Sequence, residues 1–273
     1  MAIITLTSDI GKQDFLTGAI KGRILQINPE LRIVDISHDV QPFNYHHAAY
    51  VCSNSIKNFP ENTLHLIFIN LFSNNNNHIL LIRHNEQYIG IADNGLIKMI
   101  LQESPKNVVA LDTREYGTRN ILNYTSVWIN AYDQLLNGKA FEELGNPQIE
   151  IEEKNPLRPM HSSQYLEGQI IFIDNFENVI INITKEEFEQ QRRGRSFKIY
   201  FTRGEVIDKI SETYADVRES EKLAMFNSAG YLEIAINQGN AAGLFGLEGY
   251  VDPKSQYLQS RLLYQTVKIM FED

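Results

Sequence analysis

The chain has 273 residues, of which 43% are hydrophobic, and this is enough for two ordinary domains that each bury a core. Its 34 acidic residues outnumber its 25 basic residues, and the net charge of −9 argues against a polyanionic partner such as nucleic acid. Residues 192–195 form one short basic run, which we interpret as a solvated turn rather than a binding patch.

The single cysteine and the start of the chain bear on the cellular compartment. Cys52 rules out an intrachain disulfide, and its uncharged neighbours do not activate a thiolate, so we expect it to pack in the core. The residues after Met1 enter a strand-like run directly, and no apolar run approaches the ~18 residues of a membrane span. We therefore expect a soluble, cytoplasmic protein without a membrane partner.

The first part of the chain alternates strand-like and helix-like segments. The third predicted strand is almost wholly apolar, as expected for a parallel strand that is buried on both faces. Such alternation favours right-handed crossovers and a doubly wound, mostly parallel sheet. Strands are predicted at residues 3–7, 31–36 and 64–69, and helices at residues 14–27 and 46–58.

An asparagine run follows at residues 74–77, and it predicts an irregular loop because asparagine favours turns and left-handed backbone conformations. Beyond this loop the pattern alternates again. We expect a hairpin of residues 79–83 and 87–91, a helix at 96–101, a strand at 108–111 and a helix at 128–136.

Prolines at positions 147, 156 and 159 mark the predicted domain boundary. We expect an N-terminal α/β domain over residues 1–150, a linker over about 151–164 and a C-terminal domain over 165–273. Short β-like runs separated by Gly, Asn and Asp predict that the C-terminal part is a smaller antiparallel β-barrel. The predicted strands there are residues 168–174, 179–184, 197–201, 224–226, 231–236 and 266–271.

Three stretches carry polar groups of a kind that bind ligands. Asp9 ends the first strand and precedes Gly11, so its carboxylate is a candidate ligand-binding group at the carboxyl edge of a sheet. The alternative is that Ser8 or Asp9 caps the next helix. Residues 174–178 place a carboxylate, a ring and amides within one turn, which suits a polar, planar molecule or is an ordinary hairpin turn. Residues 227–231 offer N–H groups and a hydroxyl in the same way.

Familiar catalytic signatures are missing from the sequence. There is no G-x-S-x-G elbow, no P-loop, no G-x-G-x-x-G and no histidine pair with zinc spacing, so no metal site is predicted. His38 and Asp39 resemble a base beside an acid, but neighbours on a strand face opposite ways, and we interpret them as structural.

Taken together, segments along nearly the whole chain resemble the S-adenosyl-L-methionine (SAM) hydroxide adenosyltransferase family, whose relatives include fluorinating and chlorinating adenosyl enzymes. The first segment reads L-T-S-D-I-G and the last N-S-A-G-Y-L-E-I-A, and the others follow in the order of the family. The matching segments are residues 6–11, 27–29, 33–38, 59–60, 92–96, 173–178 and 227–235.

The resemblance implies an N-terminal α/β domain, a C-terminal β-barrel and a homotrimer, with nucleoside sites between the N domain of one subunit and the C domain of the next. It implies that Asp9 binds the ribose hydroxyls, since a carboxylate accepts from both members of a vicinal diol. Asp174, Phe176 and Asn178 match the segment that holds the amino-acid end and part of the adenosine, and Ser228 lies in the matching C-terminal segment. SAM is then a substrate or ligand, and no separate cofactor is expected.

The sequence departs from the family at the positions of its catalytic residues. Hydrolysing members carry an aspartate at the head of a V-D-P-G-V-G-like loop, where this chain has Asn70, and the arginine of that loop falls within residues 74–78. Asn123 or a neighbour replaces the histidine of an F-H-G-R-D-like motif. One hypothesis is SAM hydrolysis with the nucleophile placed by Asn70 and Asn123. The alternatives are an adenosyl-binding protein without turnover and a structural or protein-binding subunit.

Overall fold

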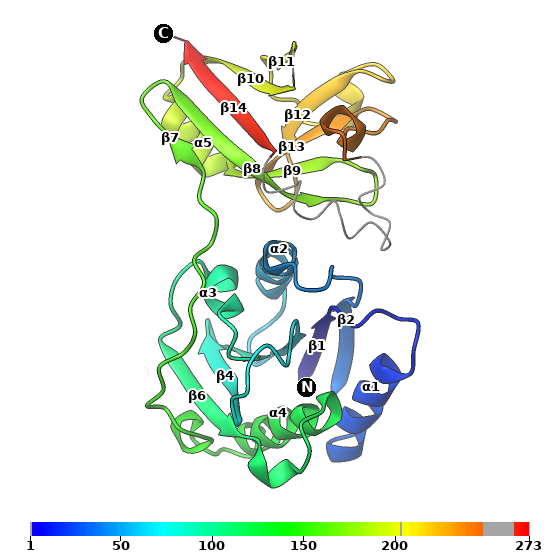
Figure 1. The fold of residues 1–273 in the computed structure, drawn as a ribbon, viewed down its shortest axis with the longest axis vertical. Helices are drawn as coiled ribbons and strands as arrows, with labels where there is room; N and C mark the ends of the chain where they lie inside the picture. The colour runs from blue at the N-terminus through cyan, green and yellow to red at the C-terminus, as the bar shows by residue number, and fades with distance from the viewer. Residues whose placement is uncertain (1, 203, 248–264, 273) are drawn as a thin grey trace. The chain divides into compact units, whose positions relative to one another are not determined.

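The computed structural model describes residues 2–202, 204–247 and 265–272 (Figure 1). The chain divides into two compact units, Met1–Pro156 and Leu157–Asp273. The division falls inside the segment 151–164 that the sequence analysis gives as a linker. The residues of this segment contact structured parts of both units. The Glu152 N–H donates to Asp93, and strand β7 (Met160–His161) pairs with strand β8 (Tyr165–Ile173).

A six-stranded sheet forms the centre of the first unit, in the order β2-β1-β3-β5-β4-β6. β1 is parallel to β2 and β3, and β3 is parallel to β5, whereas β4 is antiparallel to both of its neighbours. This mostly parallel sheet confirms the predicted α/β class. The strands are β1 (Ile3–Ser8), β2 (Arg32–Ser37), β3 (Leu64–Phe68), β4 (His78–His84), β5 (Gln87–Ile91) and β6 (Asn107–Asp112).

Helices cover both faces of this sheet, as Figure 1 shows. α1 and α4 pack on one face around Trp128 and Tyr132, and α2 and α3 pack on the other around Cys52 and Leu96. The helices are α1 (Leu16–Ile27), α2 (Tyr45–Ile56), α3 (Leu96–Leu101) and α4 (Ile121–Leu136), with short 3-10 turns η1 (Arg114–Tyr116) and η2 (Phe141–Glu143).

The strand order reverses at β1, because the chain goes from β1 to β2 on one side and then to β3 on the other. Open α/β sheets bind ligands at such a switch point, beyond the carboxyl ends of the strands. Asp9 follows β1 and Asn70 lies just beyond β3, so both residues are at this edge. All five residues of β3 are buried, as the apolar pattern predicts.

The second unit is a nearly closed antiparallel barrel in the order β11-β10-β14-β8-β9-β13-β12. Ile210, just after β11, bridges Ala224 of β12, and this joins the two ends of that order. The predicted β-barrel is therefore confirmed. Its elements are β7 (Met160–His161), β8 (Tyr165–Ile173), β9 (Val179–Thr184), α5 (Lys185–Arg192), β10 (Ser196–Thr202), β11 (Glu205–Ile207), η3 (Tyr214–Asp216), β12 (Lys222–Phe226), β13 (Tyr231–Ile236), η4 (Ala242–Phe245) and β14 (Thr266–Glu272).

Four helices differ from the sequence prediction. α2 covers Tyr45–Ile56, so it begins one residue earlier and ends two residues earlier than the predicted 46–58. α1 begins two residues later than predicted, and Phe15, just before it, is 72% exposed. α4 begins at Ile121 rather than at residue 128, because Asn120 caps it by accepting from the Asn123 N–H. α5 was not predicted, since Phe188 is the one side chain that it buries.

Cys52 is 1% exposed, which confirms that it packs in the core, and burial raises the pKa of its thiol to about 12. Among the described residues, no helix combines the length and the apolar content that crossing a bilayer requires.

Candidate functional site

The carboxylate of Asp9 faces the end of the neighbouring strand β3. Asp9 Oδ2 accepts from the Asn70 N–H at 2.9 Å. It does not cap α1, because the N-cap position is Phe15 and the Leu16 N–H donates to Asp14. The capping alternative for Asp9 is therefore wrong.

Ser8 makes a buried contact with His38, next to the Asp9 carboxylate. Its Oγ lies 2.7 Å from His38 Nδ1, and His38 Nε2 lies 3.2 Å from Asp35 Oδ1. Asp39 instead pairs with Lys12 on the surface. His38 and Asp39 thus do not act together, and His38 supports the end of β1, which agrees with the structural interpretation.

Two opposing effects set the pKa of Asp9. Burial raises it above 3.8 by disfavouring the charged form, and the backbone N–H groups of Asn70 and Phe43 oppose this by stabilising the carboxylate. A half-buried carboxylate at a switch point is therefore held in place by backbone donors. It retains further lone pairs for a ligand hydroxyl.

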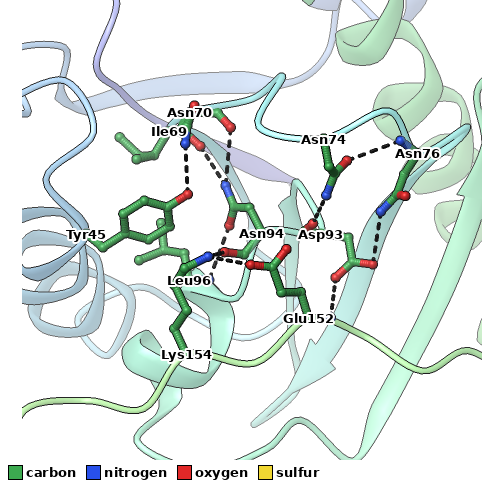
Figure 2. Close-up of polar contacts among 10 residues, drawn as sticks. All are labelled: Tyr45, Ile69, Asn70, Asn74, Asn76, Asp93, Asn94, Leu96, Glu152 and Lys154. Carbon is green, nitrogen blue, oxygen red and sulfur yellow. Dashed lines mark hydrogen bonds and ion pairs between the residues drawn. The ribbon is translucent and has the colours of Figure 1, made fainter.

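Asn70 turns the chain at the end of β3 and links three parts of the site (Figure 2). Its φ of 43° is in the left-handed region, which asparagine tolerates better than most residues. Its Nδ2 donates to the Tyr45 hydroxyl oxygen at 2.9 Å. Asn94 Nδ2 donates to the carbonyl oxygens of Ile69 at 2.9 Å and of Asn70 at 3.4 Å. The buried side-chain amide of Asn94 therefore holds this turn in place.

Asp93 fastens the asparagine-rich loop that follows. It is 5% exposed, and its carboxylate accepts from the Glu152 N–H at 2.7 Å and lies 3.0 Å from His78 Nε2. Asn74 Nδ2 donates to its carbonyl oxygen at 2.5 Å, and Asn76 Nδ2 contacts its carboxylate at 3.5 Å. The loop is irregular, as predicted, but both of its halves are attached to one buried residue (Figure 2).

Lys154 brings a positive charge to the same edge. Its Nζ donates to the Asn94 carbonyl oxygen and to Glu152 Oε1, each at 2.5 Å, and lies 4.8 Å from the centre of the Tyr45 ring. This cation–π contact stabilises the ring whose hydroxyl accepts from Asn70.

Asn123, the other predicted catalytic residue, lies in the first turn of α4. Its N–H donates to Asn120 Oδ1 at 2.9 Å, and its Nδ2 donates to the Thr118 carbonyl oxygen at 2.7 Å. The structure brings Asp9 and Asn70 into contact, while these bonds tie Asn123 to the turn before its own helix.

In the second unit, Asp174 organises the turn between β8 and β9. Its carboxylate accepts from the N–H groups of Phe176 and Asn178 at 2.9 Å and from Asn178 Nδ2 at 3.0 Å. Phe176 is 75% exposed, whereas Asn178 is 4% exposed. Ser228 is exposed in the turn between β12 and β13. Within this unit the ring of Phe176 is available to a ligand, and Asn178 shapes the turn.

The sequence matches one protein family over both units. Residues 4–145 match the SAM hydroxide adenosyltransferase N-terminal domain, and residues 168–251 match the SAM hydroxide adenosyltransferase C-terminal domain. The chain belongs to the SAM hydroxide adenosyltransferase family.

Curated relatives of this SAM hydroxide adenosyltransferase family member carry two kinds of name. It is 29% identical over 268 residues to the (R)-S-adenosyl-L-methionine hydrolase of Methanocaldococcus jannaschii, covering 92% of this chain and 94% of that protein. The hydrolase of the same name from Thermus thermophilus is 24% identical, with 91% and 97% covered. The fluorinase of Nocardia brasiliensis is 26% identical, with 90% and 94% covered.

Solved structures share the fold of this SAM hydroxide adenosyltransferase family member. An uncharacterized conserved protein from Thermotoga maritima matches with a TM-score of 0.78 and 22% identity, over 99% of this chain and all of that chain. A conserved hypothetical protein from Thermus thermophilus matches with a TM-score of 0.70 and 21% identity, over the whole of both chains.

Several polar residues at the site of this family member are not predicted from its sequence. Asn94 follows the end of β5, so its position on the carboxyl edge was a usable signal. Tyr45 and Lys154 gave none, because only the tertiary structure brings them to Asn70. Glu233 interrupts the apolar run of β13, is 3% exposed and accepts from the Tyr214 hydroxyl at 2.7 Å. Burial raises the pKa of Glu233, and the negative charge of Asp174 raises it further. The two carboxylates are therefore close enough to repel each other.

Proposed function

We propose that the protein binds SAM and hydrolyses it to adenosine and methionine. The observation that carries the proposal is the half-buried carboxylate of Asp9 at the switch point of a sheet, in contact with Asn70 at 2.9 Å. Family membership of both units and relatives named as (R)-S-adenosyl-L-methionine hydrolases support the choice of substrate.

The chemistry needs modest help from the protein. The sulfonium of SAM is a good leaving group, so the main requirements are to hold the ribose and to place a water in line with the C5′–S bond. The Asp9 carboxylate accepts from the ribose hydroxyls. Asn70 orients the water through hydrogen bonds of its amide. It does not act as a general base, because an amide does not take a proton near neutral pH. We keep Asn123 as a second candidate for placing the water.

Residues of the second unit complete the proposed binding site. Asp174 holds the amino-acid end of the ligand in the turn that Asn178 shapes, Phe176 offers its exposed ring to the adenosine, and Ser228 adds a hydroxyl. No cofactor takes part, because the sulfonium is itself the activated group.

We propose further that the protein acts in the cytoplasm as a homotrimer, with each site formed by the first unit of one subunit and the second unit of the next. Asp9 and Asp174 belong to different compact units, so a site that contains both has to draw on two units. The single buried thiol of Cys52 suits a reducing compartment.

Incubation of the purified protein with each sulfonium epimer of SAM tests the proposal, with adenosine and methionine measured by chromatography. We expect equal amounts of both products from the (R) epimer and none from an Asp9→Asn variant. Asp39→Asn is the matched control, because Asp39 lies nearby on the surface and pairs only with Lys12 among the residues described. Calorimetric binding of SAM without any product contradicts hydrolysis and leaves a binding protein.

A further inference from the structure

Over the described ranges, the side-chain amide of Asn70 makes one hydrogen bond, to Tyr45. Its Nδ2 donates to the Tyr45 oxygen at 2.9 Å, so its Oδ1 points away from that bond. Within the described parts of the chain, no group donates to this Oδ1. Asn70 therefore presents an unused hydrogen-bond acceptor beside the Asp9 carboxylate that its N–H contacts.

The hydroxyl of Tyr45 is the matching donor. Its oxygen accepts from Asn70, and its own hydrogen has no acceptor among the residues that the structure describes. The ring is held from its face by the Lys154 ammonium at 4.8 Å, and Lys154 is itself fixed by the Asn94 carbonyl oxygen and Glu152. Asn94 in turn donates to the Asn70 carbonyl oxygen, which closes the set of contacts (Figure 2).

We propose that Tyr45 and Asn70 form a donor–acceptor pair that takes water as the nucleophile and rejects halide. This inference rests on the proposed function and adds the residues that select water over halide. A water accepts from the Tyr45 hydroxyl and donates to Asn70 Oδ1, and one lone pair remains for the ribose carbon. A halide is only an acceptor, so it meets the partial negative charge of Oδ1 and lacks a compensating donor there.

The step is balanced with water alone. The water oxygen forms a bond to C5′, the C5′–S bond breaks, and its electron pair stays on the sulfur of methionine. The extra proton on the new 5′-oxygen passes to solvent water, because neither the amide nor the phenol takes it. Tyr45 and Asn70 contact the reacting oxygen, whereas Lys154 is a positioning residue that holds the Tyr45 ring.

Binding of three nucleosides tests the pair without requiring turnover, because the 5′-hydroxyl of adenosine is the oxygen that the water becomes. Calorimetry is run with adenosine, 5′-deoxyadenosine and 5′-chloro-5′-deoxyadenosine. We expect the wild type to prefer adenosine over the other two by about 10-fold, the size of one or two hydrogen bonds. Tyr45→Phe keeps the ring but removes the donor, and it is expected to lose most of this preference while binding 5′-deoxyadenosine as before.

Tyr88→Phe is the matched control, because Tyr88 lies at the amino end of β5 and stacks on Phe141 at 6.3 Å between ring centres. It is expected to keep the full preference. Lys154→Met keeps the length of the side chain without its charge, and the expected result is an intermediate preference with a lower kcat and an unchanged KM for SAM.

Several outcomes overturn the inference. Full preference for adenosine in Tyr45→Phe, equal binding of the chloro compound by the wild type, or 5′-chloro-5′-deoxyadenosine formed from SAM in chloride buffer each does so. If no nucleoside binds the wild type, the inference and the proposed function both fail. If the preference follows the prediction but SAM gives no products, hydrolysis fails while the donor–acceptor pair stands.

Discussion

At the scale of single residues, the carboxylate proposed to bind the ligand, Asp9, lowers the stability of the folded protein near neutral pH. Burial raises its pKa in the folded protein above the value of 3.8 that it has in an unfolded chain. Its contribution to the free energy of folding is therefore most favourable below pH 3.8 and is lost as the pH rises through the raised pKa. Near neutral pH the ionised carboxylate is retained at the expense of stability, as at many binding sites.

Asp9→Asn is accordingly expected to raise the melting temperature at pH 7 and to weaken adenosine binding at least tenfold. The asparagine oxygen still accepts from the Asn70 N–H, but the buried charge and one diol acceptor are gone. Scanning calorimetry and titration calorimetry measure the two effects. A variant that loses stability at pH 7, or that binds adenosine as tightly as the wild type, contradicts this account of Asp9.

The same pKa predicts how binding depends on pH. A protonated carboxyl accepts poorly from a diol, so the affinity for adenosine is expected to fall as the pH decreases, with a midpoint above 3.8. Titrations at a series of pH values in one buffer system show this midpoint. Retained affinity well below that pH would mean that the ionised form of Asp9 is not the one that binds.

At the scale of elements, Asp93 attaches the loop after β3 to the segment that leaves the first unit. Asp93→Ala removes a buried carboxylate that accepts from the Glu152 N–H and faces His78. We expect the free energy of unfolding to fall by about 2–4 kcal/mol, since buried donors lose a charged partner. Limited proteolysis is expected to cut within residues 70–78.

Asp112→Ala provides the control for Asp93. Asp112 is exposed at the end of β6 and pairs with Arg114 on the surface, so its loss is expected to cost less than about 1 kcal/mol. Chemical denaturation of both variants gives the comparison. Equal destabilisation by the two substitutions would show that Asp93 does not hold the loop in place.

Elements with a clear hydrophobic period were predictable, and those defined by polar residues were not. β3 and β9 follow from their apolar runs, because burial on both faces leaves little choice of residue. The start of α4 was missed because its first turn is capped by a side chain, and α5 was missed although Thr184 and Glu187 form a capping box.

The site was predictable only in part, for a similar reason. Asp9 and Asn70 follow strands directly, so their place at the sheet edge is local information. Tyr45 and Lys154 come from a helix face and from the end of the first unit, and only tertiary packing brings them together. The same holds for the contact of Glu233 with Tyr214.

At the scale of the whole molecule, the predicted ligand-binding residues are divided between two units that each have their own core. A homotrimer with shared sites predicts complementation. Asp9→Asn and Asp174→Asn are expected to be inactive alone, whereas co-expressed subunits mix and give about a quarter of the sites both carboxylates.

Light scattering checks that the mixed sample has three times the 31.4 kDa mass of the chain, and circular dichroism checks that each variant is folded. Recovery of up to a quarter of the wild-type rate of adenosine release supports the shared site. Mixed trimers that stay inactive contradict it, because a site built from one chain gains nothing from mixing.

Hydrolysis of SAM by water is the central claim, and isotope labelling tests it most directly. The purified protein is incubated with SAM in water enriched in ¹⁸O, and the products are analysed by mass spectrometry. We predict one ¹⁸O atom in the 5′-hydroxyl of adenosine and none in methionine. Adenosine without the label, or no adenosine above a control without protein, would contradict the claim.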